Sequence, residues 1–350
     1  MIRAYRGELL HFLADPAKVP LEKSYQYFED GLLVIEAGRV AKLGDAASLL
    51  TSLPPEIQIT HYKTGLMMPG FIDTHVHYPQ TEMVASYGEQ LLEWLQNYTF
   101  PAERQFADEA HAKDVAKFFL TQLLEAGTTT ALVFGTVHKE SVDAFFKVAK
   151  QKNLRMICGK VLMDQNCPDY LSDSPESGYA ESKALIEKWH KNERLQYAVT
   201  PRFAPTSSAE QLAKAGELLS EYPDVYLQTH LSENRDEVEW VNKLFPNNKN
   251  YLDVYDQSKL LGRRSIFAHG VHLRDAEFQR LGESQSSLAF CPGSNLFLGS
   301  GLFNLAQAQA HNINIGFGTD IGAGTTFSML SVTTHPVASK KRKIFHKKSK

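Results

Sequence analysis

Residues 69–80 read PGFIDTHVHYPQ, and this stretch decides how the rest of the chain is interpreted. An apolar run ends in His75 and His77, and Pro79 follows directly. Residues two apart on a β-strand project from the same face, so both imidazoles can reach one point. The stretch therefore predicts a buried strand that ends at a functional site.

Seven further runs of the same kind follow, each rich in β-branched or aromatic residues and too short for a helix. They span residues 128–135, 154–164, 195–203, 225–233, 265–273, 286–295 and 313–320. Amphipathic stretches separate most of these runs, and one of them begins at Asp108, a favourable N-cap, and ends at Gly127. Eight strands alternating with helices predict an α/β fold, a (β/α)₈ TIM-type barrel over residues 66–330.

Both ends of the chain differ from this central part. Residues 1–65 read as short strands and turns, with a hairpin that turns at Gly38-Arg39, and predict a partial small β-domain. Residues 331–350 hold seven Lys/Arg and no acidic residue, so residues 1–330 carry a net charge of −10. Because this basic tail has neither a helical nor a strand period, we expect it to be disordered.

Composition excludes several classes of protein. The chain has 350 residues, 43% hydrophobic and 22% charged, as expected for a globular protein. Its net charge of −3 predicts no nucleic-acid partner, and the absence of a long apolar run predicts no membrane segment. Three scattered cysteines favour a reducing, cytoplasmic location. The KKRK stretch in the tail is an alternative nuclear-localisation or nucleic-acid patch.

Polar side chains gather at one end of the predicted barrel. Catalytic groups of such barrels lie at the carboxyl ends of the strands. The residues at those ends are His75, His77, Arg202, His230, Glu233, His269, His272 and Asp320. Five of the thirteen histidines thus fall at one rim.

Four of these side chains predict a metal site. His75 and His77 share one strand, and His230 and Asp320 can complete the shell from two others. Three imidazoles with one carboxylate suit Zn²⁺, although Fe²⁺ and Mn²⁺ also fit. A single histidine at a strand end is usually structural, and it is the joint pattern that favours a metal.

The PGFIDTHVH and GTD motifs resemble those of the amidohydrolase superfamily, and the resemblance covers residues 1–330. It implies a metal-dependent hydrolase barrel with a small N-terminal β-domain, in a chain that forms a homodimer. Members with two metals use a carboxylated lysine on the fourth strand. The fourth run here has no lysine at its end, and Lys160 in the third is a poor substitute. The resemblance therefore implies one Zn²⁺ per subunit.

Four further motifs, HYPQ (77–80), PRF (201–203), HLSEN (230–234) and GTDIGAGTT (318–326), are together similar to the members that deaminate guanine. The implied reaction is the zinc-dependent hydrolysis of guanine to xanthine and ammonia. The resemblance implies substrate contacts from His77, Gln80, Arg202, Phe203, His230, Glu233 and Asp320. Arg202 suits the oxygen and N7 acceptors of guanine, and Phe203 supplies a flat apolar wall.

The resemblance also assigns catalytic roles. Water activated at the metal attacks C2 of guanine, and Asp320 takes its proton. Glu233 protonates N3, and His269 forms a hydrogen bond with the attacking oxygen. Glu233 has an alternative role as the first-turn acid of the helix that follows it. His272 is interpreted as structural.

Two alternatives to this enzyme remain open. The chain lacks the roughly one hundred residues that follow the eighth strand in the family, which suggests a truncated or alternatively spliced form without the last barrel helix. Such a form would be a non-catalytic partner of longer chains. A second alternative is an amidohydrolase acting on another ring amine, such as a triazine, cytosine or a modified adenosine. Zinc deaminases of the cytidine type are excluded because no C-x-x-C motif occurs.

Overall fold

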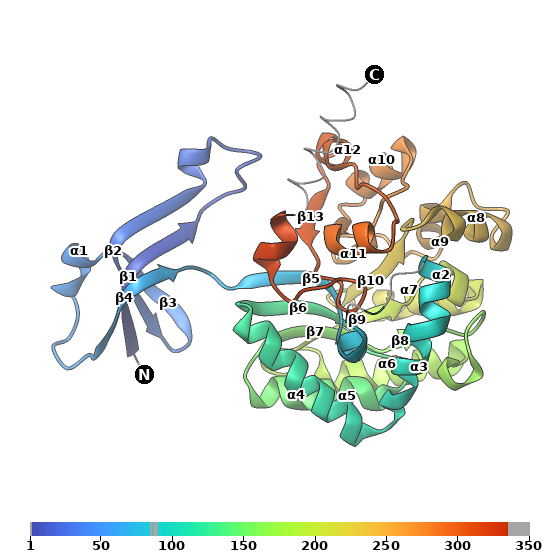
Figure 1. The fold of residues 1–350 in the computed structure, drawn as a ribbon, viewed down its shortest axis with the longest axis horizontal. Coiled ribbons are helices and arrows are strands. Elements are labelled where there is room, and N and C mark those ends of the chain that lie inside the picture. The colour runs from blue at the N-terminus through green and yellow to red at the C-terminus, as the bar shows by residue number, and fades with distance from the viewer. Residues whose placement is uncertain (1, 85, 87–89, 335–350) are drawn as a thin grey trace. The chain divides into compact units, whose positions relative to one another are not determined.

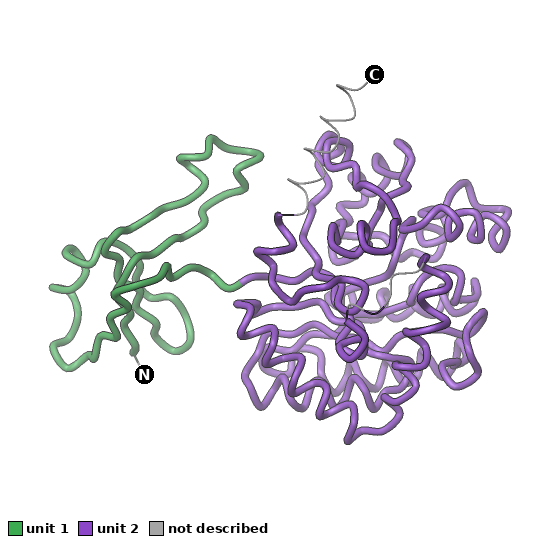
Figure 2. Tube along the Cα trace, in the orientation of Figure 1, with its two compact units in different colours: residues 1–70 green, residues 71–350 purple. Residues whose placement is uncertain are grey.

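In the computed structural model of the protein, residues 2–84, 86 and 90–334 are described (Figure 1). The chain divides into two compact units, Met1–Gly70 and Phe71–Lys350 (Figure 2). The predicted boundary after residue 65 falls inside a strand, β4 (Ile59–Met67), which belongs to the first unit. Within the described residues, no helix has the length and apolarity needed to cross a bilayer.

The N-terminal unit is a four-stranded sheet in the order β3-β2-β1-β4. Its elements are β1 (Ile2–Phe12), η1 (Leu21–Lys23), β2 (Tyr25–Glu36), β3 (Arg39–Asp45), α1 (Ala46–Leu50) and β4. Strands β2 and β3 form the predicted hairpin. Its turn lies one residue earlier than predicted, because Ala37 and Gly38 are the residues with positive φ, 49° and 78°. The buried apolar residues described in this unit are few: Leu9 and a cluster of Ala4, Leu32, Val34 and Ala46.

The second unit is built on parallel strands in the order β13-β12-β11-β10-β9-β7-β6-β5. Their bounds are β5 (Phe71–His77), β6 (Thr128–Phe134), β7 (Arg155–Gly159), β9 (Gln196–Pro201), β10 (Tyr226–Leu231), β11 (Ser265–His269), β12 (Ser287–Phe290) and β13 (Asn314–Phe317). The eight predicted runs are all confirmed as strands. The third run contains two, because β8 (Val161–Leu162) follows β7 and pairs with β9.

The first and last strands of this order also meet. The hydroxyl of Thr74 donates to the carbonyl of Phe317 at 2.9 Å, and the amide of Asp320 donates to the carbonyl of His75 at 2.9 Å. The amide of His77 donates to the carbonyl of Ile321 at 2.8 Å. These bonds bring β13 against β5, so the parallel strands form a nearly closed TIM-type barrel, as predicted.

Helices surround the strands (Figure 1). The longer ones are α4 (Glu109–Glu125), α5 (Lys139–Gln151), α6 (Pro175–Trp189), α7 (Ala209–Glu221), α8 (Arg235–Leu244), α9 (Tyr251–Gln257) and α10 (Asp275–Glu283). Short helices lie at strand ends or between helices: η2 (Tyr78–Met83), α2 (Leu91–Trp94), η3 (Leu95–Thr99), α3 (Phe100–Glu103), η4 (Arg104–Ala107), η5 (Asp169–Leu171), η6 (Ala204–Thr206), α11 (Pro292–Phe297) and α12 (Leu305–Ala310). Asp108 caps α4 as predicted, accepting a hydrogen bond from the amide of Ala110.

The last described residues correct one prediction. Residues 329–334 are helical, so the expectation of irregular structure from residue 331 is wrong for 331–334. The remainder of the predicted basic tail, 335–350, lies outside the described residues.

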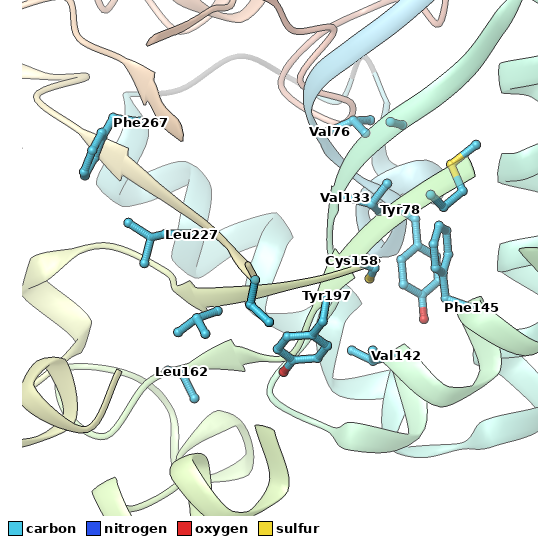
Figure 3. Close-up of a cluster of buried hydrophobic side chains, with 14 of the residues drawn as sticks. Val76, Tyr78, Val133, Val142, Phe145, Cys158, Leu162, Tyr197, Leu227 and Phe267 are labelled. Atoms are coloured by element: carbon cyan, nitrogen blue, oxygen red, sulfur yellow. The ribbon is translucent and has the colours of Figure 1, made fainter. Parts of the chain in front are cut away.

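The main core lies between the strands and the helices, because alternate residues of each strand face outward. Tyr78 packs against Phe145 with ring centroids 5.1 Å apart, and Tyr197, Leu227 and Phe267 belong to the same buried cluster (Figure 3). The intervening residues face the barrel interior, where small or aliphatic side chains form two further clusters: Leu132, Ile157 and Ala198, and Ala268, Ala289 and Cys291. This packing holds the carboxyl ends of the strands in fixed positions.

Candidate active site and metal centre

Five predicted site residues converge at the carboxyl ends of four strands. His75 and His77 end β5, His230 lies on β10, His269 ends β11, and Asp320 follows β13. Adjacent atoms of the cluster are close: His77 Nε2 lies 3.2 Å from both His75 Nε2 and His230 Nε2. The Oδ1 atom of Asp320 lies 3.3 Å from His75 Nε2 and 3.4 Å from His77 Nε2. The structure therefore brings the four predicted ligands together.

The backbone around Asp320 is fixed by buried hydrogen bonds. Asp73 accepts bonds from both the amide and the hydroxyl of Thr319. Asp320 has a positive φ of 53°, and His269 has one of 75°. Such values are unfavourable for residues other than glycine and persist only where the surrounding structure holds them. Functional sites are where this kind of strain concentrates.

Hydrogen bonds also orient two of the imidazoles. His230 Nδ1 lies 2.7 Å from the carbonyl oxygen of Arg202, which can only accept, so Nδ1 carries the proton. In the neutral ring, Nε2 then keeps its lone pair toward the cluster. His269 Nδ1 lies 3.0 Å from Oδ1 of Asn295. Such contacts to the second ring nitrogen are typical of metal-binding histidines.

The electrostatics of the cluster favour neutral imidazoles around an ionised carboxylate. Burial lowers the pKa of His75, His77 and His230. Burial alone would raise the pKa of Asp320, but hydrogen bonds from His75 and Ser294 and the electrostatic effects of His75 and His269 together outweigh it and hold this pKa below its usual range. The Nε2 lone pair of His230 lies 3.2 Å from Nε2 of His77, in a cluster that also holds the carboxylate of Asp320 and includes no lysine or arginine among the described residues to balance it. A bound cation would balance this charge, so the residues present fit a metal ion.

Other combinations of donors also lie within coordinating range of one another. Nitrogen atoms of His75, His230 and His269 are all within 4.8 Å of each other, and the same holds for the ligand atoms of His75, Cys291 and Asp320. Cys291 was not predicted as a site residue, because no sequence motif links this lone cysteine to the histidines. Burial raises the pKa of its thiol well above the usual value.

Lys160 lies away from this cluster. Its ammonium group is fully buried and forms an ion pair with Asp173, and Glu181 lies 3.6 Å from it. An amine held in this way is not available to bridge two metals at the carboxyl ends of the strands. Lys160 is therefore not a candidate bridging ligand, and a site with one metal ion stays a prediction.

A pocket opens beside the cluster. It is lined by His77, Gln80, Leu91, Trp94, Leu95, Thr99, Arg202, Phe203, His230, Glu233, His269, Leu298, Asp320 and Ala323. All the residues predicted to contact substrate are in this lining. Apolar walls with a few convergent polar groups are typical of small-molecule sites.

Glu233 faces this pocket and does not begin the helix that follows. Helix α8 is capped by Asn234, so the alternative role of Glu233 in its first turn is wrong. The Oε2 atom of Glu233 lies 3.4 Å from His269 Nε2, and Ser300 donates to its Oε1 at 3.5 Å. Burial, reinforced by the charge of Asp320, raises the pKa of Glu233 well above its usual value. Such a carboxyl group can donate a proton near neutral pH.

His272 has the structural position expected for it. Its Nε2 atom lies 2.8 Å from the carbonyl of Ser300, the residue whose side chain contacts Glu233.

Sequence reasoning missed one buried charge behind the pocket wall. Glu103 is completely buried, and both of its oxygens accept from Nη1 of Arg202, at 3.0 and 2.8 Å. Gln80 also donates to Glu103, at 3.2 Å. The residue lies 99 positions before Arg202, in a segment without a clear helical or strand period, so no local pattern signalled it.

Residues 66–347 match the amidohydrolase family. The chain is 54% identical to the guanine deaminase of Escherichia coli K12 over 332 residues, which is 94% of this chain and 75% of that protein. It superposes on the solved structure of E. coli guanine deaminase with a TM-score of 0.93 and 53% identity, covering 95% of this chain and 77% of that one.

A second solved structure, the guanine deaminase of C. acetobutylicum with bound guanine, gives a TM-score of 0.90 at 29% identity and covers 100% of this chain and 82% of that one. The barrel topology, the cluster of histidines at its carboxyl rim and the sequence match therefore agree with one another. From these findings, this chain is a member of the amidohydrolase family.

Proposed function

We propose that this chain catalyses the hydrolytic deamination of guanine to xanthine and ammonia, with one Zn²⁺ held by His75, His77, His230 and Asp320. The observation that carries the proposal is that one pocket joins this metal-ligand cluster to Gln80, Arg202 and Phe203, in a chain 54% identical to a guanine deaminase. A bound zinc ion would supply the Lewis acidity that makes water a nucleophile near neutral pH.

The side chains of the pocket account for the remaining chemistry. The reaction forms a bond between water oxygen and C2 of guanine and breaks the bond from C2 to the exocyclic nitrogen. Asp320 takes a proton from the attacking water, and Glu233 gives a proton to N3 as C2 becomes tetrahedral. The exocyclic nitrogen then receives the proton held by Asp320 and leaves as ammonia, and the proton of the C2 hydroxyl passes to Glu233 as the C2 carbonyl of xanthine forms, which restores both carboxyl groups.

Three residues serve binding and orientation. Arg202 donates to the oxygen and N7 of guanine, and the amide of Gln80 can both donate to and accept from the base. Phe203 packs on the ring. His269 lies 3.9 Å from Oδ2 of Asp320, close enough to hold the attacking oxygen by a hydrogen bond.

The experiment is turnover of guanine by the purified chain, followed by xanthine formation and accompanied by metal analysis. We expect xanthine and ammonia in equal amounts and about one zinc per chain, both lost on dialysis against a chelator. The His230→Ala variant should lose metal and activity together, whereas His61→Ala, an exposed histidine of the N-terminal unit, should lose neither. Turnover of cytosine or a triazine without xanthine formation from guanine would overturn the proposal.

Two finer proposals concern assembly, from the family resemblance, and location, from the scattered cysteines. They are that the protein is a homodimer and that it is cytoplasmic. Sedimentation velocity on the purified chain measures the first, and microscopy of the tagged protein in its own cells measures the second.

A further inference from the structure

Two pocket-lining residues, Arg202 and Gln80, belong to a buried network of three polar residues completed by Glu103. Arg202 and Gln80 line the pocket, with 3% and 4% of their surfaces exposed. Glu103 lies behind them with 0% exposed and accepts hydrogen bonds from both. A charged pair taken so completely out of water is expensive unless its geometry is good, so its presence beside a ligand pocket requires a reason.

We propose that Glu103 is a positioning residue that fixes the donor pattern of Arg202 and Gln80, and thereby makes the pocket selective for a 6-oxopurine. This inference rests on the proposed function. It adds a residue that determines which base edge the pocket accepts.

The orientation of the Gln80 amide follows from its two partners. A carboxylate can only accept, so the amide nitrogen of Gln80 must face Glu103, at 3.2 Å. The backbone amide of Gly322 can only donate, so the amide oxygen of Gln80 must face Gly322, also at 3.2 Å. A flipped amide would place donor against donor and acceptor against acceptor. Glu103 and the amide of Gly322 thus together determine which end of the Gln80 amide is the donor.

The orientation of Arg202 follows in a similar way. Both hydrogen bonds to Glu103 use Nη1, so the N–H groups of Nε and Nη2 remain for other partners. The guanidinium carbon also lies 5.5 Å from the ring centroid of Phe100, on the same short helix as Glu103. The guanidinium group is therefore held from two sides by one element, and its remaining donors suit the two acceptors on the edge of a 6-oxopurine.

The local backbone explains how Glu103 reaches this position. The segment before it, η3, is a turn of π-helix. Pro101 has no N–H group, and its ring conflicts with the carbonyl four residues earlier, so a regular α-helix cannot continue through it. Turns of π-helix are often found at functional sites. Here the wider turn precedes the residue that contacts both pocket side chains.

The test compares two inert ligands that differ at the recognised edge. Hypoxanthine has the oxygen and N7 of guanine but no amino group at C2, and purine lacks the oxygen as well. Equilibrium dialysis of the full chain should show hypoxanthine bound at least about 10-fold more tightly than purine, because a site built for a polar edge rejects the analogue that lacks it. In Glu103→Gln the ratio of the two dissociation constants, purine over hypoxanthine, should fall below about 3-fold. The single amide oxygen of the new side chain cannot accept hydrogen bonds from both Arg202 and Gln80 as the two carboxylate oxygens do.

Activity gives a second readout. For guanine, Glu103→Gln should raise KM about 10-fold and change kcat less than about 3-fold, as expected when substrate binding and not the chemical step is disturbed. Glu93→Gln, an exposed acid on the neighbouring helix α2, is the matched control and should change neither value. If Glu103→Gln does not fold, Glu103→Asp replaces it, because the shorter side chain withdraws the carboxylate from Gln80 while keeping the charge.

The outcomes separate this inference from the proposed function. A wild-type chain that binds hypoxanthine no better than purine overturns the inference, whether or not it deaminates guanine. A Glu103→Gln variant that keeps the wild-type preference for hypoxanthine over purine also overturns the inference, because Glu103 would then only neutralise the charge of Arg202. A wild-type chain that shows the ratio but forms no xanthine leaves the inference intact and overturns the proposed function.

Discussion

Glu233 is the residue on which proton transfer to the substrate depends. Its carboxyl group lies 3.4 Å from His269, and burial raises its pKa well above the usual value. Glu233→Gln keeps the size of the side chain and removes the transferable proton. We expect kcat for guanine to fall by about 10²–10⁴, which is the usual contribution of a general acid or base.

Metal content and thermal stability distinguish this effect from structural damage, because both should stay at wild-type values in Glu233→Gln. The control is Glu239→Gln, on the exposed side of helix α8, which should keep full activity. A Glu233→Gln enzyme within about threefold of wild-type kcat would show that another group supplies the proton.

Glu237 fixes the backbone of Glu233 through a hydrogen bond. Its Oε2 atom accepts from the amides of Glu233 and Asn234, at 2.7 and 3.0 Å, and Tyr251 donates to its Oε1 at 2.8 Å. Burial raises the pKa of Glu237 above its ordinary value of 4.5, although these hydrogen bonds oppose the shift. The charged form is thus disfavoured in the folded protein.

The sign of the pH dependence follows from this direction. A raised folded pKa gives a stabilising contribution that is complete below about pH 4.5 and is lost as the pH rises through the raised value. The free energy of unfolding of the wild type, minus that of Glu237→Gln, should therefore decrease from pH 4.5 upward. Urea unfolding at several pH values measures this difference. A difference that is flat or grows with pH would contradict the prediction.

At the scale of elements, the approach of β7 to β9 requires a glycine. A Cβ atom at Gly159 would overlap the carbonyl oxygen of Ala198, whereas one at Gly293 would meet nothing within 4 Å. Gly159→Ala should therefore cost about 3 kcal/mol or more in the free energy of unfolding. Gly293→Ala in helix α11 is the matched control and should be neutral or stabilising by up to about 1 kcal/mol. Equal changes in the free energy of unfolding in the two variants would show that the approach of β7 to β9 does not require a glycine.

The strands could be predicted because each carries its own signal, a short apolar run rich in β-branched residues. The convergence of His75, His77, His230 and Asp320 could be predicted because these residues occupy the same end of such runs. Glu103 and Cys291 could not be predicted in this way. The first depends on a partner 99 residues away and on a turn of π-helix, and the second approaches the histidines only when the barrel closes.

At the scale of the whole molecule, the two units differ in the size of their cores. The buried hydrophobic cluster of the N-terminal unit consists of four residues, including Leu32, whereas one continuous cluster underlies most of the barrel. Stability rises with the apolar surface that a unit buries, so the N-terminal unit should be the less stable of the two. Its strands should open in hydrogen exchange at a lower free energy than those of the barrel.

Leu32→Ala tests whether the two units are stabilised separately. The change removes a completely buried side chain, for which a loss of about 2–5 kcal/mol is usual, from a unit that has few other buried apolar side chains. We expect hydrogen-exchange protection of β1 to β4 to collapse while β5 to β13 keep theirs, because no member of the barrel core is altered. Val40→Ala, at a side chain 60% exposed in the same sheet, is the control and should leave both units protected. An equal loss of protection in the barrel strands would mean that the two units unfold as one.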